Sequence, residues 1–324
     1  MAETLPNWLH DVEALRRFAK IRLIVIDLDG TLISSAQPNP LLNTIKDLVR
    51  SLNHHRYKVG LTIATGRTLA GVRPVLETLP LHKGVPLILY NGSLVVRNGT
   101  FKVIERRTIS LESLQQIIET SSNHCVRTFA YFYNDPWFEA QDVSEHEYVM
   151  GWTSNCEPGH EFNNMPVRWL STPEVGKTIE PSALLIDTSN DPTAAAQIEL
   201  ELANIHDISI TRSGIRYIEV RPKGSNKGIA LERIANDTDL TRDEILALGD
   251  NDNDSEMLTW AGIGVAISEA SPTALTSSDY VCHYGVYEGV VEALRLVRLA
   301  RRYFFHPTKK QQVLDEDEPH RTVV

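Results

Sequence analysis

Cysteine and long apolar runs are both scarce in this chain of 324 residues. Its three cysteines, Cys125, Cys156 and Cys282, form no Cys-x-x-Cys pair, so neither a disulfide framework nor a zinc site is predicted. No stretch approaches the ~20 consecutive apolar residues that a membrane-spanning helix requires. Asp11 and Glu13 precede any long apolar run, unlike in a secretory signal. We therefore expect a soluble cytoplasmic protein without a membrane partner.

Basic residues are outnumbered as well. The chain has 32 Lys plus Arg against 42 Asp plus Glu, a net charge of −10 with neutral His. This balance argues against a nucleic-acid partner, because a phosphate backbone attracts basic proteins. It does not exclude a small phosphorylated metabolite, since a few local cations or a bound metal hold a phosphate whatever the net charge. The composition predicts no particular oligomeric state.

The apolar run of residues 21–26 is the most informative segment, because it ends abruptly in Asp27-Leu28-Asp29-Gly30. Such a run is typical of a buried parallel strand. Side chains two residues apart on a strand point to the same side, so Asp27 and Asp29 are predicted to share one side. Asp-Gly is also a common turn pair, and a strand that merely stops at a polar turn is the alternative.

Strand-like and helix-like segments alternate before residue 93 and again after residue 221, which predicts a doubly wound, Rossmann-like parallel sheet. The predicted strands of this sheet are residues 21–26, 58–64, 86–90, 244–248, 263–267 and 280–282. The intervening sequence instead favours hairpins, one with Asn98-Gly99 as a type I′ turn and one with Ser213-Gly214 at its tip. Residues 151–181 are predicted to be rich in loops. The predicted fold class is therefore α/β with an inserted α+β domain.

The predicted domains follow from these patterns. They are an N-terminal helical extension at residues 1–20, a core at 21–92 and 222–303, an α+β insert at 93–221, and a disordered tail at 304–324. The tail carries Asp315-Glu316-Asp317-Glu318 and lacks apolar periodicity. Binding of a partner by this acidic tail is the alternative.

Polar residues follow four of the predicted strands. They are Asp27 with Asp29, Thr65 with Gly66, Asn91, and Asp250. Ligands of open α/β sheets bind at the carboxyl ends of the strands, so we expect these groups to form one site.

The paired carboxylates suit phosphoryl transfer, which needs an in-line nucleophile, neutralisation of the phosphoryl charge and help for the leaving oxygen. Asp27 directly follows the strand and is the predicted nucleophile, which forms an aspartyl-phosphate. Asp29 is predicted to protonate the departing alkoxide and later to deprotonate the attacking water, which requires a raised pKa.

Two carboxylates and a dianionic ester repel one another, so the chemistry requires a divalent cation. Mg2+ fits best, because it binds oxygen ligands, typically one or two carboxylates with waters and the substrate phosphate. Asp250 supplies the further carboxylate. The segment that starts at Asp250 also matches positions one, three and five of a calcium loop, but Ser255 and Ala261 replace the Gly and Glu that positions six and twelve require.

Thr65 and Gly66 are placed where a strand is predicted to turn into a helix. A hydroxyl and backbone N–H groups in that place suit an anion, with the helix dipole behind them. We therefore predict that both bind the substrate phosphate. The alternative is that Thr65 only caps the helix.

Four segments together resemble the motifs of haloacid dehalogenase (HAD) superfamily phosphatases. They are Asp27-Leu28-Asp29-Gly30-Thr31-Leu32, Ala64-Thr65-Gly66-Arg67, Lys227-Gly228 and Gly249-Asp250-Asn251-Asp252-Asn253-Asp254. The insert and Tyr90-Asn91-Gly92-Ser93 resemble the Cof-type (class IIB cap) branch in particular. The resemblance covers about residues 21–300 and implies a HAD-like core with a mobile α+β cap. It gives Asp27 and Asp29 the roles stated above.

The resemblance also implies a set of metal ligands. Asp250 would bind Mg2+ together with Asp27 and the backbone carbonyl of Asp29. Asp254 would support the metal from the same loop, and Asn253 would lie near the phosphate.

Lys227 is the cation that the family pattern selects, because it directly precedes Gly-x-Ala-Leu. Its ammonium would neutralise Asp27 and the transferring phosphoryl group. Lys223 is the local competitor and is expected to be a solvated loop charge. Arg67 and Asn91 would be secondary substrate contacts. Glu269 stands where the family usually has Asn, which would add negative charge on the phosphate side and alter substrate preference.

The predicted function is thus a Mg2+-dependent phosphatase of a small phosphorylated metabolite, with sugar phosphates as the leading substrate class. Two alternatives stay open. One is a phosphomutase that moves phosphate between two hydroxyls of a hexose, similar to a phosphomannomutase. The other is a non-catalytic regulatory protein on the same fold.

Overall fold

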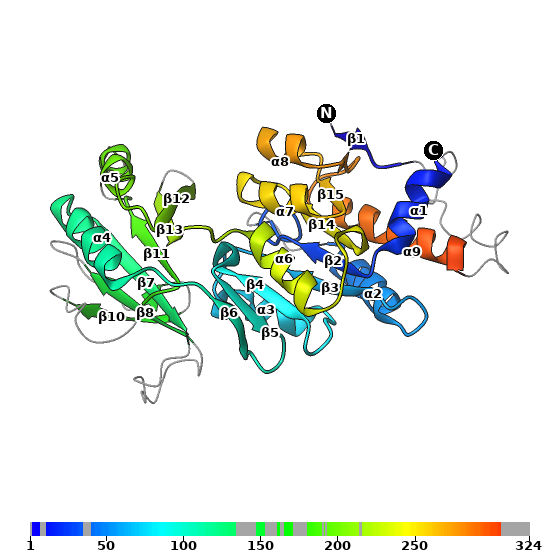
Figure 1. The fold of residues 1–324 in the computed structure, drawn as a ribbon, viewed down its shortest axis with the longest axis horizontal. Helices are drawn as coiled ribbons and strands as arrows, with labels where there is room; N and C mark the ends of the chain where they lie inside the picture. The colour runs from blue at the N-terminus through cyan, green and yellow to red at the C-terminus, as the bar shows by residue number, and fades with distance from the viewer. Residues whose placement is uncertain are drawn as a thin grey trace. The chain divides into compact units, whose positions relative to one another are not determined.

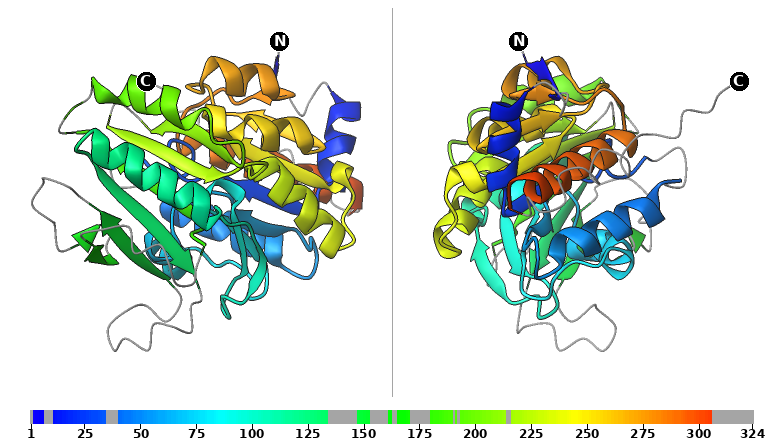
Figure 2. Two further views of the ribbon diagram at one scale, coloured as in Figure 1. Left: turned by 60° about the vertical axis from the view of Figure 1, so that its left-hand side comes forward. Right: turned by 90° about the vertical axis from the view of Figure 1, so that its right-hand side faces the viewer.

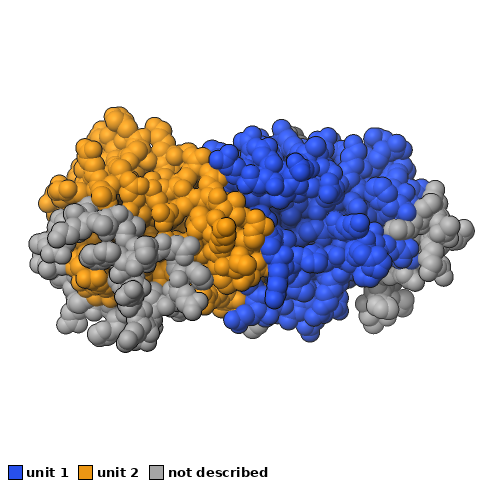
Figure 3. Space-filling view, turned by 60° about the horizontal axis from the view of Figure 1, so that its bottom comes forward, with its two compact units in different colours: residues 1–65, 76–87, 227–324 blue, residues 66–75, 88–226 orange. Residues whose placement is uncertain are grey.

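A computed structural model describes most of the chain. The described residues are 2–6, 11–34, 40–133, 147–152, 161–162, 165–170, 180–189, 191, 193–213 and 216–305. Two compact units divide the chain, unit 1 (residues 1–65, 76–87 and 227–324) and unit 2 (residues 66–75 and 88–226), as Figure 3 shows by colour. Residues 66–75, which were predicted to lie in the core, belong to the compact unit 2. The division into core and cap at residues 92 and 221 stays a prediction.

Unit 1 contains a six-stranded sheet in the order β1-β16-β15-β14-β2-β3, and every neighbouring pair is parallel (Figure 1). Its strands are β1 (Glu3–Thr4), β2 (Leu23–Ile26), β3 (Gly60–Ile63), β14 (Ile245–Gly249), β15 (Ile263–Ala266) and β16 (Tyr280–Val281). The predicted parallel sheet is thereby confirmed. Strand β1 was missed, because two residues are too few to show a period.

Helices cover both faces of this sheet, as Figures 1 and 2 show. They are α1 (Val12–Lys20), α2 (Leu42–Asn53), α6 (Lys227–Asp237), α7 (Ser255–Trp260), α8 (Pro272–Ser277) and α9 (Glu288–Phe305), with short helices η3 (Arg242–Glu244) and η4 (Asp252–Asp254). Helices α1 and α2 pack against α9, whereas α7 packs between α6 and α8. No helix in the described ranges is long and apolar enough to cross a membrane.

The register of strand β2 aligns the ends of its two neighbours, β14 and the edge strand β3. Ile26 pairs with Leu248 of β14 on one side and with Ile63 of β3 on the other. Every residue of β2 is buried, as expected for a parallel strand covered on both faces. Since parallel strands run in one direction, the residues after β2 and β14 leave the sheet at the same edge.

Unit 2 is built on a seven-stranded sheet in the order β12-β13-β11-β7-β8-β10-β9, in which all pairs except β8 with β10 are antiparallel. Its strands are β7 (Arg127–Tyr133), β8 (Glu147–Trp152), β9 (Glu161–Phe162), β10 (Met165–Leu170), β11 (Ala183–Asp187), β12 (Ile208–Ser213) and β13 (Tyr217–Pro222). Helices α4 (Leu111–Asn123) and α5 (Ala194–Leu202) cover one face and share its apolar core (Figure 2).

The prediction of a loop-rich region at residues 151–181 was partly wrong, because β8 ends there and β10 lies within it. Pro166 and the lack of strict alternation in β10 conceal the strand in the sequence. The hairpin around Ser213 is confirmed by the pairing of β12 with β13, and its tip at residues 214–215 lies outside the described residues.

A three-stranded sheet joins β4 (Pro86–Leu89), β5 (Leu94–Arg97) and β6 (Val103–Arg106), and the short helix η1 (Tyr90–Gly92) connects the first two strands. The expectation that residues 86–90 add to the parallel sheet was therefore wrong. Strands β5 and β6 form the predicted hairpin. Its turn is not type I′, because the positive φ angles are at Gly99 and Phe101 rather than at Asn98. Five residues, 98–102, join the two strands, so the connection is longer than the two-residue loop of a type I′ turn.

The ends of the chain differ from the prediction in detail. Helix α9 continues to Phe305, so residues 304 and 305 are helical. The remaining tail, residues 306–324, lies outside the described residues. At the N-terminus, the helical extension predicted at residues 1–20 contains the short strand β1 and the helix α1, which begins at Val12.

Substitution of Asp187 in unit 2 tests a buried ion pair. Its carboxylate is 1% exposed and accepts hydrogen bonds from Arg127 (2.7 Å) and Arg216 (3.3 Å). We expect Asp187→Asn to lower the free energy of unfolding at pH 7 by about 1–3 kcal/mol, because the arginines lose a charged acceptor. Urea unfolding followed by circular dichroism measures this change.

The effect of Asp187→Asn on the free energy of unfolding should also depend on pH. Burial alone would raise the pKa of Asp187, but hydrogen bonds from Ser189 and Arg216 and the charge of Arg127 lower it. The stabilisation is therefore present above the ordinary pKa of about 3.9 and is lost as the pH falls below it. Glu199→Gln, at the more exposed pair with Arg212, is the control and should change stability by less than about 1 kcal/mol.

Candidate active site

A buried ammonium group lies between two carboxylates in unit 1. Asp27 directly follows β2, and Lys227 is the first residue of α6. The Nζ atom of Lys227 lies 2.5 Å from Oδ1 of Asp27 and 2.7 Å from Oδ1 of Asp254. The side chains of Lys227 and Asp254 are fully buried, and that of Asp27 is 6% exposed. Lys223, the competing cation, is exposed.

Asp254 also holds the loop that follows β14. Its Oδ2 accepts hydrogen bonds from the backbone N–H groups of Asp250 (3.0 Å) and Asn251 (3.1 Å). Gly249 permits this tight return, because a Cβ atom on it would lie 2.6 Å from Cβ of Asp254. Both carboxylate oxygens of Asp254 are therefore used to orient Lys227 and the loop.

Asp250 is held from the other side by the segment after Asp27. Its Oδ1 accepts a hydrogen bond from the hydroxyl of Thr31 (2.7 Å). Gly30 has a φ of +92°, and a Cβ atom there would lie 2.1 Å from Oδ2 of Asp250. Only a glycine fits this close approach. The role of Thr31 was missed, although its place directly after Asp29-Gly30 was a signal.

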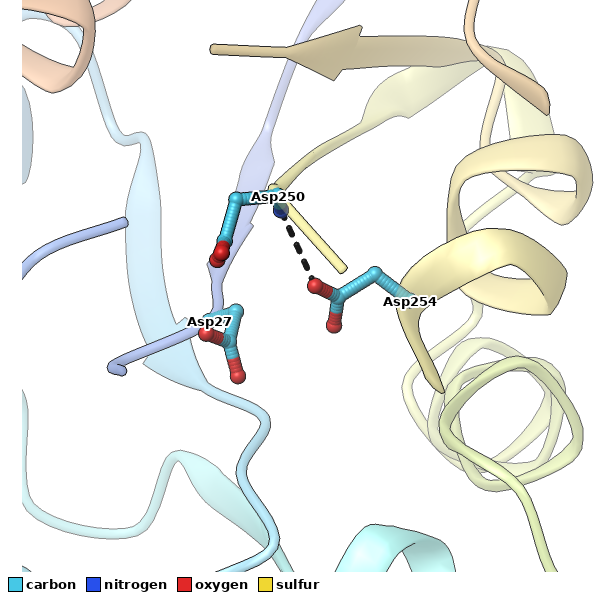
Figure 4. A group of neighbouring side chains, drawn as sticks. All are labelled: Asp27, Asp250 and Asp254. Carbon is cyan, nitrogen blue, oxygen red and sulfur yellow. Dashed lines mark hydrogen bonds between the residues drawn. The ribbon is translucent and has the colours of Figure 1, made fainter. Parts of the chain in front are cut away.

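Asp250 adds a third carboxylate beside the two that contact Lys227. One oxygen each of Asp27, Asp250 and Asp254 lies within 4.8 Å of the others. Figure 4 shows these three side chains next to one another. Burial and then the charge of Asp254 raise the pKa of Asp27, although Lys227 opposes this. Burial lowers the pKa of Lys227, but the charges of Asp254 and Asp27 raise it by more, so that it stays charged. The cluster has surplus negative charge and oxygen donors, which fits a divalent cation such as Mg2+.

Asp29 is exposed, and its backbone forms a bridge with Ile33. Burial raises the pKa of Asp250 to about 6, the hydrogen bond from Thr31 opposes this, and the charges of Asp254 and Asp29 add to the rise. Asp29 therefore acts electrostatically on the acidic cluster. Asn253, the remaining residue predicted in this loop, is half-buried in η4.

The predicted phosphate-binding segment differs from expectation. Thr65 is buried, but α3 (Leu69–Thr78) begins four residues later, and its first turn is capped by Thr68, whose hydroxyl accepts from the N–H of Gly71 (2.9 Å). The alternative that Thr65 caps the helix was therefore wrong. The expectation of a helix N-terminus directly behind Gly66 was wrong as well.

Gly66, Arg67 and Asn91 form a second group, within unit 2. The carbonyl of Arg67 accepts a hydrogen bond from the N–H of Tyr90 (3.2 Å). A Cβ atom on Gly66 would lie 2.9 Å from Nδ2 of Asn91. Asn91 is buried with a positive φ of 52°, and its side chain donates to Glu219 of β13 (3.0 Å). Glu219 was missed, because an acidic residue in a strand carries no motif.

The fold and these motifs match a known family. The family model described as haloacid dehalogenase-like hydrolase matches residues 24–294. The chain belongs to this family. As the motifs predicted, this hydrolase is a HAD phosphatase of the Cof type, and its enzyme class is phosphoric monoester hydrolase.

Similar proteins cover nearly the same length. The 5-amino-6-(5-phospho-D-ribitylamino)uracil phosphatase YcsE of Bacillus subtilis (strain 168) is 28% identical over 284 residues, which are 86% of this chain and 97% of the relative. A haloacid dehalogenase-like hydrolase from Bacteroides thetaiotaomicron has a solved structure with a TM-score of 0.68 and 24% identity, covering 85% of this chain and 98% of that one.

A second solved structure, of the HAD subclass IIB sugar phosphatase BT4131, has a TM-score of 0.63 and 20% identity, covering 85% of this hydrolase and 98% of that chain. Both solved structures share the fold of this hydrolase.

Replacement of Lys227 tests the buried cluster. We expect Lys227→Met to destabilise the hydrolase by about 3–5 kcal/mol at pH 7, because it leaves Asp27 and Asp254 charged and unpaired. The loss should shrink as the pH is lowered from 7 towards 5, because the pKa of Asp27 is raised above its ordinary value and protonation removes its unpaired charge. Urea unfolding at both pH values measures it.

Lys223→Met is the matched control, because Lys223 is an exposed lysine four residues away. We expect it to change stability by no more than about 0.5 kcal/mol. Equal losses for the two variants would contradict a special stabilising role of Lys227.

Proposed function

We propose that this HAD phosphatase hydrolyses a small phosphorylated metabolite in a Mg2+-dependent reaction through phospho-Asp27, with sugar phosphates as the substrate class. The observation that carries the proposal is the buried Lys227, which holds one oxygen of Asp27 at the end of strand β2. The names of YcsE, which refers to a phosphoribityl ester, and of the sugar phosphatase BT4131 support the choice of substrate class.

Asp27 is the proposed nucleophile. Its Oδ1 stays on Lys227, so we assign the attack to Oδ2. A bond forms between Oδ2 and phosphorus while the ester P–O bond breaks, and Asp29 gives its proton to the departing alkoxide. A water then loses its proton to Asp29 and attacks the phosphorus. The bond to Asp27 breaks, and inorganic phosphate leaves.

Mg2+ would be held by Asp27, Asp250 and the backbone carbonyl of Asp29, and when bound it supplies positive charge against the phosphoryl oxygens. Asp250 is oriented for this by Thr31. Asp254 would support the metal site by orienting Lys227 and the loop after β14, since its two oxygens already accept three hydrogen bonds.

The remaining predicted residues complete the proposal. Thr65, Gly66 and Asn253 would bind the phosphoryl group together with Lys227, and Arg67 and Asn91 would be secondary contacts. Lys227 would neutralise the equatorial oxygens as they gain charge.

The primary test is a panel of sugar phosphates and related esters, assayed for phosphate release. We expect turnover with Mg2+, none with a chelator, and a loss of at least about 10³-fold in kcat for Asp27→Asn, because the amide does not attack phosphorus. Full activity of Asp27→Asn would refute the aspartyl-phosphate. Conversion of a hexose 1-phosphate into its isomer without free phosphate, followed by NMR, would instead indicate a mutase.

Thr31 tests the metal site separately. We expect Thr31→Val to raise the Mg2+ concentration for half-maximal activity by about 10–100-fold, because Asp250 loses the hydroxyl that orients it. Thr31→Ser keeps a hydroxyl and is the matched control, with a smaller change. An unchanged Mg2+ dependence in Thr31→Val would contradict Asp250 as a ligand.

A further inference from the structure

Glu147, the first residue of β8, is a buried carboxylate that the proposed reaction does not use. It is 2% exposed. Its oxygens accept hydrogen bonds from the N–H groups of Leu69 (2.6 Å) and Ala70 (2.7 Å) and from the hydroxyl of Tyr90 (2.6 Å). All four residues belong to unit 2. A buried carboxylate is costly unless it is hydrogen-bonded, and here three donors compensate the cost.

Two of these donors are the first N–H groups of α3. They have no acceptor within the helix and lie at the positive end of its dipole, where a carboxylate is stabilised. Burial raises the pKa of Glu147, although the hydrogen bonds from Tyr90, Ala70 and Leu69 and the charge of Arg73 oppose the rise. The anion at the start of α3 is therefore a side chain of the hydrolase itself.

The third donor, the hydroxyl of Tyr90, connects Glu147 to the turn that packs against Gly66. Tyr90 donates its N–H to the carbonyl of Arg67, and the adjacent Asn91 lies against Gly66. Burial and the neighbouring Glu147 raise the pKa of Tyr90, so its hydroxyl keeps the proton that it donates. Glu147 thus contacts the helix that follows Gly66 and the turn that packs on Gly66.

We propose that Glu147 is a positioning residue for phosphate binding. By holding the start of α3 and Tyr90, it ties strand β8 to the segment after Thr65 and fixes the backbone of Gly66. This inference rests on the proposed function, in which Thr65 and Gly66 bind the phosphoryl group. It gives the inserted sequence a part in phosphate binding without any contact to substrate.

The effect should appear in phosphate affinity. In Glu147→Gln the side chain keeps its size, and its oxygen can still accept from Leu69 and Tyr90, but its NH2 group would face the N–H of Ala70, so that hydrogen bond is lost. We expect KM and the inhibition constant of inorganic phosphate to rise about tenfold, while kcat changes less than about threefold. Hydrogen exchange should become faster at the amides of Leu69 and Ala70.

Asp187→Asn is the matched control. Asp187 is also a buried carboxylate in the sheet of unit 2, and it binds two arginines instead of α3. Its replacement should leave KM and phosphate inhibition unchanged even where it lowers the melting temperature. If Glu147→Gln lowers the melting temperature by the same amount and also leaves both constants unchanged, Glu147 is structural only and the proposal is overturned.

Two further measurements test the proposal if Glu147→Gln does not fold or if no ester of the panel is hydrolysed. Tyr90→Phe removes one donor and leaves the carboxylate in place, so it should shift the same constants in the same direction by about threefold even if Glu147→Gln does not fold. Calorimetric binding of inorganic phosphate needs no turnover. Weaker phosphate binding in Glu147→Gln would support the positioning role even if the ester panel failed, whereas unchanged binding would overturn it.

Discussion

The buried ion pair of Lys227 with Asp27 and Asp254 is the interaction on which unit 1 depends. Lys227 and Asp27 are 200 positions apart in the sequence, so the pair forms only when β2, α6 and the loop after β14 are all in place. Each partner is buried, and removal of one leaves an uncompensated charge. The same arrangement keeps one oxygen of Asp27 fixed and surrounds it with the carboxylates that a divalent cation requires.

The sequence was sufficient for the parts of the structure that depend on long apolar runs and short-range motifs. Strand β2 and the loop after β14 followed from such patterns, and the family match bears out the fold and the enzyme class. The choice of Lys227 over Lys223 came from the family pattern, and its role in phosphate binding stays a prediction. The nucleophile, the acid and the metal ligands stay predictions, supported by geometry.

The contacts that sequence reasoning missed join segments far apart in the chain. Glu147 lies 78 positions from Leu69, and Glu219 lies 128 positions from Asn91. Each is a single acidic residue in a strand, without a period or a motif. The start of α3 was also misplaced, because Thr65 and Thr68 are both plausible caps by type, and only the hydrogen bond to Gly71 distinguishes them.

The hold of Glu147 on α3 has a consequence for protein engineering. A variant that lacks the insert keeps the motif residues Asp27, Thr65, Lys227, Asp250 and Asp254. It nevertheless loses the carboxylate that accepts from Leu69 and Ala70 and the one that accepts from Asn91. Chimeric HAD phosphatases therefore need donor inserts that carry matching acceptors, in addition to a compatible substrate pocket.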